Sequence, residues 1–357
     1  MTDVTVGLMV SGHGYGHSVR CAEVARALLQ RGVRVVLRTD APRWLYPDAV
    51  EWIPTQQWPL DIGVVQHDGL EFDIDATRQR WCEFLHGFED RARVEGDLLR
   101  ASGVDVLVAD IPPLGFAAAA RAGIPSYGLT NFTWDWIYSA WPGFEEIVEG
   151  IRGAYAKAHG LFRLPLHGDC GAFRRIEDVP LIARKATRSR GEVRRELNIP
   201  QRATVVLLSF GGFTAKGLHL KSSRALREYV FISTPPLWVD DPPENLLVLK
   251  QAPEDYVSLL AACDVVVTKP GYGIVADCLA NHVAVLFTDR GPFREYDVLA
   301  DGLHRLGRAR YIPREDLLRG DFGSHLNALV HSEADWTRQP MNGAEIVAER
   351  VVRRVTI

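Results

Sequence analysis

The sequence predicts an α/β protein with two successive doubly wound parallel sheets. An apolar, β-branched run, Val4–Val10, ends at a glycine loop that leads into a helical pattern, and a second such run, Thr204–Ser209, also ends at glycines. Strands that alternate with helices in this way form βαβ units, which require parallel pairing. The 357 residues suit two domains of roughly 150 residues each.

In the first half, the strand Val4–Val10 is followed by a helix that we expect to end at Gly32, and by a second strand, Val33–Leu37. The alternation returns as a strand at 104–109, a helix at 114–122 and a strand at 126–129. We expect one helix over 81–101 and a partly helical, aromatic region over 133–160. Residues 50–80 show no clear period and favour loops.

The second half repeats this alternation. Strands are expected at 204–209, 229–233, 246–249, 264–268 and 283–287, and helices at 253–263, 273–281 and 294–305. We therefore expect an N-terminal Rossmann-like domain over 1–170 and a C-terminal one over 171–340. The last helix, within 341–357, is predicted to pack back on the first domain.

Composition excludes several classes of protein. The net charge of −4 gives no reason to expect a nucleic-acid partner, and no apolar run is long enough to span a membrane. The five cysteines lack C-x-x-C spacing, so neither a zinc site nor a disulfide framework is expected and the protein is predicted to be cytoplasmic. The basic stretch over 184–195 is either a solvated face or a binding patch.

The first glycine loop, Gly12-His13-Gly14-Tyr15-Gly16-His17, indicates an anion site. Glycines let a ligand approach the backbone, and the amides at the start of the next helix favour a negative group. The G-x-G-x-G spacing does not fit the dinucleotide fingerprint G-x-G-x-x-G. His17 stands at the helix start as a candidate base, although either histidine could instead cap the helix or bind a carbonyl.

A second glycine loop, Lys269-Pro270-Gly271-Tyr272-Gly273, follows the strand at 264–268 and suits a diphosphate. One turn into the next helix, Asp277 could accept hydrogen bonds from a ribose, or could simply be a favourable charge at a helix N-terminus. The Gly211-Gly212 turn offers further backbone amides. The segment around Ala252 could hold a nucleobase edge or be an ordinary connecting loop.

Aromatic and acidic side chains cluster after the strand at 126–129. Asn131, Trp134 and Asp135 would suit a sugar or another hydroxyl-bearing acceptor, although tryptophans at such spacing are equally common in cores. Asp110 ends the strand at 104–109 and could orient His17 or bind a hydroxyl. Asp73-x-Asp75 has the metal pattern of a different transferase class, but it follows no strand end and is predicted to face solvent.

Together these segments resemble the GT-B glycosyltransferases, whose two Rossmann-like domains face each other across a cleft. Gly16-His17 is similar to the dipeptide that carries the catalytic base in inverting plant enzymes, and the order of the second-half segments is similar to their donor-binding region. Nearly the whole chain resembles the N-terminal, glycosyltransferase-like region of plant L-arabinokinases, through GHGYGHSVR (12–20), NFTWDWIY (131–138), DVPLIARK (178–185) and GYGIVADCL (271–279). No kinase phosphate loop is found.

The resemblance implies a glycosyltransferase that uses a nucleotide-diphosphate sugar without a metal or other cofactor. His17 and Asp110 would be catalytic, and His13, Asn131, Trp134 and Asp135 would contact a small-molecule or glycan acceptor. The donor would be bound by Gly14, Gly16, Gly211, Gly212, Ala252, Lys269, Gly271, Tyr272, Gly273 and Asp277.

Three alternatives remain open. The motif G-x-G-H-x-x-R, residues 14–20, also resembles a nucleotide-sugar hydrolase of pseudaminic acid synthesis. The chain could instead be a non-catalytic nucleotide-sugar sensor, which would bind a donor without turnover. A retaining transferase is also possible.

Overall fold

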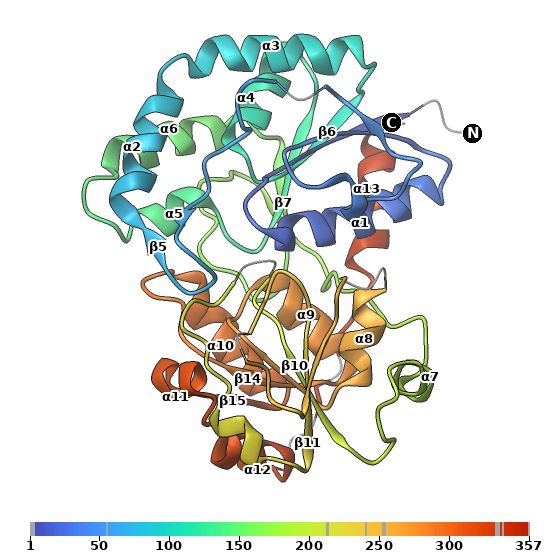
Figure 1. Ribbon diagram of the computed structural model, residues 1–357. Coiled ribbons are helices and arrows are strands. Elements are labelled where there is room, and N and C mark those ends of the chain that lie inside the picture. Colours follow the sequence, from blue (N-terminus) through green and yellow to red (C-terminus); the bar gives the residue numbers. More distant parts are fainter. Residues whose placement is uncertain are drawn as a thin grey trace. The chain divides into compact units, whose positions relative to one another are not determined.

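The computed structural model describes residues 4–54, 56–211, 214–239, 241–251, 255–332, 336–337 and 339–355 (Figure 1). The chain divides into two compact units. Unit 1 comprises Met1–Val65, Asp73–Ile182 and Gln339–Ile357, and unit 2 comprises Gln66–Phe72 and Ala183–Arg338. The main division therefore lies at residue 182, where the sequence suggested 170, and the short segment 66–72 belongs to unit 2.

Unit 1 contains a seven-stranded parallel sheet in the order β3-β2-β1-β6-β7-β8-β9. Its strands are β1 (Thr5–Val10), β2 (Arg34–Thr39), β3 (Glu51–Trp52), β6 (Val106–Asp110), β7 (Ser126–Thr130), β8 (Gly160–Arg163) and β9 (Ile176–Asp178). Every residue of β1 and β6 is buried. That burial explains why both read as continuous apolar runs in the sequence.

Helices surround this sheet: α1 (Tyr15–Leu29), α2 (Ile74–Leu85), α3 (Phe88–Ala101), α4 (Pro113–Ala122), α5 (Trp134–Tyr138), α6 (Glu145–Tyr155) and α13 (Gly343–Val355), with a short 3₁₀ turn η1 (Arg43–Leu45). Helix α13, the last of the chain, packs against α1, the first (Figure 1). Helix α3 packs against α4.

The single helix predicted over 81–101 is wrong. Helix α2 begins earlier, at Ile74, where the Asp73 carboxylate caps it by accepting from the Ala76 amide at 2.8 Å. Gly87, at φ +74°, then separates α2 from α3. A left-handed glycine stops one helix and redirects the chain into another, which a continuous amphipathic pattern conceals.

Unit 2 contains a six-stranded parallel sheet in the order β12-β11-β10-β13-β14-β15. Its strands are β10 (Thr204–Leu208), β11 (Tyr229–Ser233), β12 (Leu246–Val248), β13 (Val265–Thr268), β14 (Ala284–Phe287) and β15 (Ala309–Tyr311). The helices are α7 (Arg190–Glu196), α8 (Tyr256–Ala262), α9 (Tyr272–Asn281), α10 (Glu295–Leu306), α11 (Arg314–Arg319) and α12 (Gly323–Val330), with the 3₁₀ turn η2 (Ser222–Ala225).

The segment 66–72 joins unit 2 through its side chains. Leu70 is buried in the same apolar cluster as Val206, Val265 and Leu286 from the central strands. The Gly69 amide also donates to the Thr214 carbonyl at 2.9 Å. Short strands β4 (Val65–Gln66) and β5 (Phe72–Asp73) pair with each other at the two ends of this segment.

Both sheets reverse their winding direction at one pair of strands. In unit 1 the reversal falls between β1 and β6, and in unit 2 between β10 and β13. Ligands of open parallel sheets bind beyond the carboxyl ends of the strands at such a point. We therefore expect functional residues directly after these four strands.

In the described part of the chain, no helix is both long and apolar enough to cross a membrane.

Candidate functional site

The loop after β1 leads directly into helix α1. Gly14 precedes the helix at φ +70°, a conformation that favours glycine, and no side chain caps this helix end. Gly16 lies in the first turn, next to His17. The loop therefore leaves the first-turn amides of α1 without a side-chain acceptor, as an anion-binding helix start requires.

His17 and Asp110 meet at the reversal point of the unit 1 sheet. His17 lies in the first turn of α1, and Asp110 is the last residue of β6, which pairs with β1. The His17 Nδ1 atom lies 2.8 Å from Asp110 Oδ1, and the two side chains are 5% and 0% exposed. The fold thus places a histidine and a carboxylate in direct contact at this point.

Arg20, one turn along α1, binds the same carboxylate with two nitrogens. Its Nε donates to Asp110 Oδ2 at 2.5 Å and one terminal nitrogen donates to Oδ1 at 2.6 Å. The other terminal nitrogen donates to Asn131 Oδ1 at 2.7 Å. Burial by itself would raise the pKa of Asp110, but the charges of Arg20 and then His17 lower it below its usual value. Asp110 is therefore ionised near neutral pH.

His17 Nδ1 has two neighbours: the Asp110 carboxylate at 2.8 Å, which can only accept, and a terminal nitrogen of Arg20 at 3.0 Å, which can only donate. We assign the proton to Nδ1 on the shorter contact, with Asp110 as its acceptor. The lone pair then lies on Nε2, for which the described residues provide no hydrogen-bond partner. This is the state in which an imidazole can take a proton from a hydroxyl.

A second buried carboxyl, Asp61, belongs to the same neighbourhood. Ser11 Oγ donates to Asp61 Oδ1, and Trp134 Nε1 donates to Oδ2, both at 2.9 Å. Burial raises the pKa of Asp61 to about 6, against the lowering effects of the Ser11 hydrogen bond and the His17 charge. Asp61 lies within residues 50–80, where the sequence shows neither helix nor strand periodicity. The only sequence signal for Asp61 is a polar side chain among apolar neighbours.

The residues expected to bind an acceptor are mostly enclosed. Trp134 is 0% exposed and stacks on Tyr138 at 5.5 Å between ring centroids. Asn131 is also 0% exposed, and Asp135, 4% exposed, pairs with Arg152 at 3.0 Å. These placements argue against direct contact between the three side chains and a ligand.

His13 lies in the glycine loop and is partly exposed. Its ring meets that of Trp134 edge to face, and its Nδ1 accepts from the Val64 amide at 3.3 Å. The ring of His17 lies 6.2 Å from the same tryptophan. His13, His17 and Asp61 therefore share one neighbour, Trp134.

In unit 2 the loop after β13 leads into α9. Gly271, which has no side chain to act as a cap, precedes this ten-residue helix, and Tyr272 and Gly273 form its first turn. Lys269 is 7% exposed, and burial lowers its pKa well below the ordinary value, with the Arg290 charge acting in the same direction. A helix start that follows an enclosed lysine favours an anionic ligand.

Asp277 has a partner within unit 2. Its two oxygens accept from the Arg184 backbone amide at 2.9 Å and from two nitrogens of the Arg184 guanidinium, at 3.0 and 2.5 Å. The carboxyl is 0% exposed. This geometry argues against a direct contact with ribose, because a ribose would have to displace Arg184. Asp277 is also more than a negative charge near a helix N-terminus, because it binds Arg184 directly.

The remaining predictions concern three donor-site residues and the basic stretch over 184–195. Gly211 follows β10 at φ +70°, while Gly212 and Ala252 lie outside the described residues. The basic stretch is largely paired with carboxylates: Arg190 and Arg194 both bind Asp264. Arg194 is buried, whereas Lys185, Arg188, Arg190 and Arg195 are exposed, so most of this stretch is a solvated face with one enclosed arginine.

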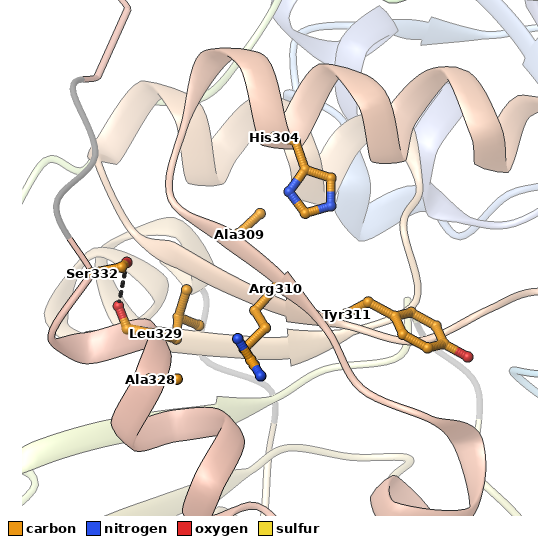
Figure 2. A pocket seen from close by; sticks show the side chains of 7 residues that line it. All are labelled: His304, Ala309, Arg310, Tyr311, Ala328, Leu329 and Ser332. Carbon is orange, nitrogen blue, oxygen red and sulfur yellow. Dashed lines mark hydrogen bonds between the residues drawn. The ribbon is translucent and has the colours of Figure 1, made fainter.

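A cavity of about 330 Å³ lies in unit 2, at the edge strand β15 (Figure 2). It is lined by His304, Ala309, Arg310, Tyr311, Ala328, Leu329 and Ser332, none of which is a predicted site residue. Among the described residues, no group of three or more His, Cys, Asp or Glu side chains is arranged to hold a metal ion. Asp75 of the D-x-D pattern is exposed, and Asp73 caps α2.

Comparison with solved structures establishes the fold. The glycosyltransferase of kitacinnamycin matches with a TM-score of 0.63 at 18% identity, over 99% of this chain and 96% of that one. The fold is that of the GT-B glycosyltransferases. UGT89C1 of Arabidopsis thaliana, solved with UDP, matches with a TM-score of 0.58 at 15% identity, over 99% of this chain and 94% of its own.

One curated relative is similar in sequence. L-arabinokinase of Arabidopsis thaliana is 33% identical over 350 residues, which cover 95% of this chain. Those residues are only 33% of that protein, so the chain spans about a third of the relative's length. No family model matches the chain. The chain is therefore GT-B in fold and arabinokinase-like in sequence.

Proposed function

We propose that the protein transfers a sugar from a nucleotide-diphosphate sugar to an acceptor hydroxyl, with inversion and with His17 as the base. The observation that carries this proposal is the buried His17–Asp110 contact, at 2.8 Å, where the GT-B sheet of unit 1 reverses its winding. A base at this point lies beyond the carboxyl ends of the strands, where ligands of such sheets bind.

In the proposed reaction, His17 Nε2 takes the proton of the acceptor hydroxyl as its oxygen attacks the anomeric carbon. The bond between that carbon and the phosphate oxygen breaks, and the nucleoside diphosphate leaves with the electron pair. Asp110 keeps the imidazole oriented through Nδ1, and Arg20 holds Asp110. General-base catalysis of this kind contributes about 10²- to 10⁴-fold in rate.

The donor diphosphate is assigned to the loops of unit 2. The start of α9, at Gly271, Tyr272 and Gly273, would donate backbone amides, and Lys269 would supply positive charge. The left-handed turn at Gly211 lies beyond the neighbouring strand β10. Fixed amides and enclosed cations can stabilise a leaving diphosphate without a divalent metal. That the solved plant transferase binds UDP supports this assignment by analogy.

Hydrolysis is the second candidate, and the enclosed acceptor residues favour it. Asn131 and Trp134 are 0% exposed and Asp135 is 4% exposed, so these side chains offer little surface to an acceptor. With water as the acceptor, the same base and the same donor loops would release a free sugar. A donor-binding protein without turnover is the third outcome to be tested.

The test is a panel of nucleotide-diphosphate sugars incubated with the protein, with and without candidate acceptors and with chelator added throughout. Release of diphosphate that depends on an acceptor supports transfer, and stoichiometric free sugar without an acceptor supports hydrolysis. Binding without release identifies a sensor. A panel that neither binds nor reacts contradicts the proposal.

A further inference from the structure

We propose that Asp61 is a positioning residue of the His17 site: its carboxylate, rather than that of Asp110, supplies the negative charge that stabilises His17 once it has taken a proton. This inference deepens the proposed function and rests on it.

The negative charge of Asp110 is already offset within the protein. Arg20 binds both Asp110 oxygens, at 2.5 and 2.6 Å, and Arg20 itself is 2% exposed. A terminal nitrogen of Arg20 also lies 3.0 Å from His17 Nδ1. When His17 takes a proton, its neighbour is therefore an Arg20–Asp110 pair with almost no net charge, and the guanidinium of that pair contacts the imidazole. Asp110 alone cannot compensate the new charge.

Among the described residues, Asp61 forms no hydrogen bond or ion pair with an arginine or lysine. Its hydrogen-bond partners, Ser11 and Trp134, are neutral donors, at 2.9 Å each. Because Asp61 is only 6% exposed, its charge is poorly solvated and acts strongly on neighbouring groups. A positive charge on His17 lowers the pKa of Asp61. Because opposite charges attract in a poorly solvated site, an ionised Asp61 in turn stabilises a positive charge on the imidazole.

The local packing holds the two groups in one neighbourhood. The indole nitrogen of Trp134 donates to Asp61, and its ring lies next to the His17 ring. The Phe132 ring meets the His17 ring edge to face, with 5.5 Å between the ring centroids. On the other side, Ser11 connects the strand β1 to Asp61, and its own amide donates to the Asp110 carbonyl at 2.8 Å. Trp134, which the sequence suggested as an acceptor platform, thus acts as a support for Asp61.

Other titratable groups around the pair do not supply the missing charge. The Asp40 charge raises the pKa of Asp61 and so works against its ionisation, and Asp40 is itself paired with Arg38 at 3.0 Å. Tyr138 and Tyr155 have pKa values raised well above normal by burial and stay neutral. Cys21, beside Asp110, is likewise kept protonated because burial raises its pKa.

The first test follows the Asp61 carboxyl by ¹³C NMR as a function of pH, in the wild-type protein and in His17→Gln. The expected midpoint is about 6 in the wild type, and it should move upward in His17→Gln because the cationic neighbour is lost. His159→Gln, an exposed histidine of the same unit, is the matched control and should leave the midpoint unchanged. An Asp61 midpoint that His17→Gln does not move overturns the inference.

The second test measures turnover. Asp61→Asn keeps the shape of the side chain, and kcat should fall about tenfold while the donor Kd stays unchanged. Asp105→Asn, an exposed carboxylate at the start of β6, is the control with the same change of charge. A kcat within twofold of wild type overturns the inference. A wild-type protein without turnover would contradict the proposed function. The NMR titration does not depend on turnover, so it tests the coupling of Asp61 to His17 independently.

Discussion

Two arginine–aspartate pairs, Arg20–Asp110 in unit 1 and Arg184–Asp277 in unit 2, differ in what else they contact. In unit 1, Arg20–Asp110 is shared with His17, whose Nε2 has no hydrogen-bond partner among the described residues. In unit 2, Arg184–Asp277 is closed on itself, because the side chain and the backbone amide of Arg184 occupy both carboxylate oxygens. The first pair can serve chemistry, and the second fastens residues 183–187 to α9.

The largest expected effect separates these two roles. Asp110→Ala and Asp277→Ala each remove the carboxylate that pairs with an arginine. The loss should cost about 3 kcal/mol of folding stability for the buried Arg20, and less for Arg184, whose side chain is 25% exposed. Asp110→Ala should also abolish turnover, whereas Asp277→Ala should keep the turnover of the folded fraction within a few-fold of wild type. Chemical denaturation and donor-consumption rates measure the two quantities. Equal losses of turnover in both variants would erase the distinction.

A smaller effect concerns the pH dependence of stability that Asp61 contributes. Its folded-state pKa of about 6 lies above the unfolded value of about 3.9, so the folded state holds the proton more tightly. The stabilising contribution is therefore present below about pH 4 and is lost as the pH rises through about 6. Asp61→Asn, which cannot ionise, should be about 3 kcal/mol more stable than wild type at pH 8 and nearly equally stable at pH 4.

Denaturation at the two pH values measures this gain. A variant that becomes more stable while turnover falls is the signature of a residue kept for function. If Asp61→Asn is less stable than wild type at pH 8, the carboxylate contributes to stability and the comparison between the units loses its basis.

The smallest effect concerns donor affinity in unit 2. Lys269→Ala should weaken nucleotide-diphosphate binding about tenfold, because one enclosed charge-assisted contact is lost. Since burial depresses the pKa of Lys269, wild-type affinity should also fall as the pH rises and the amine loses its proton. Calorimetric titration measures both, with the exposed Lys221→Ala as the control. An unchanged Kd in Lys269→Ala would remove this residue from the donor site.

Much of the fold could be predicted from sequence, and the reason lies in burial. Fully buried parallel strands such as β1 and β10 are continuous apolar runs that end at glycines, so both the strands and the loops beyond them stand out. Short strands such as β8, β9 and β15 were missed, because three or four residues carry too little pattern. The break at Gly87 was missed because helical periodicity continues on both sides of it.

The candidate site was only partly predictable. The glycine loop identifies His17, and the end of a predicted strand identifies Asp110. Both lie at the same edge of the sheet because the two strands that precede them, β1 and β6, run parallel to each other. Partners distant in sequence gave no signal: Asp277 and Arg184 are 93 residues apart, and Asp61 meets Trp134 across 73 residues. Burial of Trp134 also depends on this tertiary packing, so its choice as an acceptor platform could not be tested from spacing alone.

The most direct test of the account is ³¹P NMR of a nucleotide-diphosphate sugar panel with wild-type protein and with His17→Ala, alongside donor Kd values for both. The account predicts that wild type releases nucleoside diphosphate and that His17→Ala does so at least about 100-fold more slowly, with the same donor Kd. Release at equal rates by the two proteins would contradict the assignment of His17 as the base.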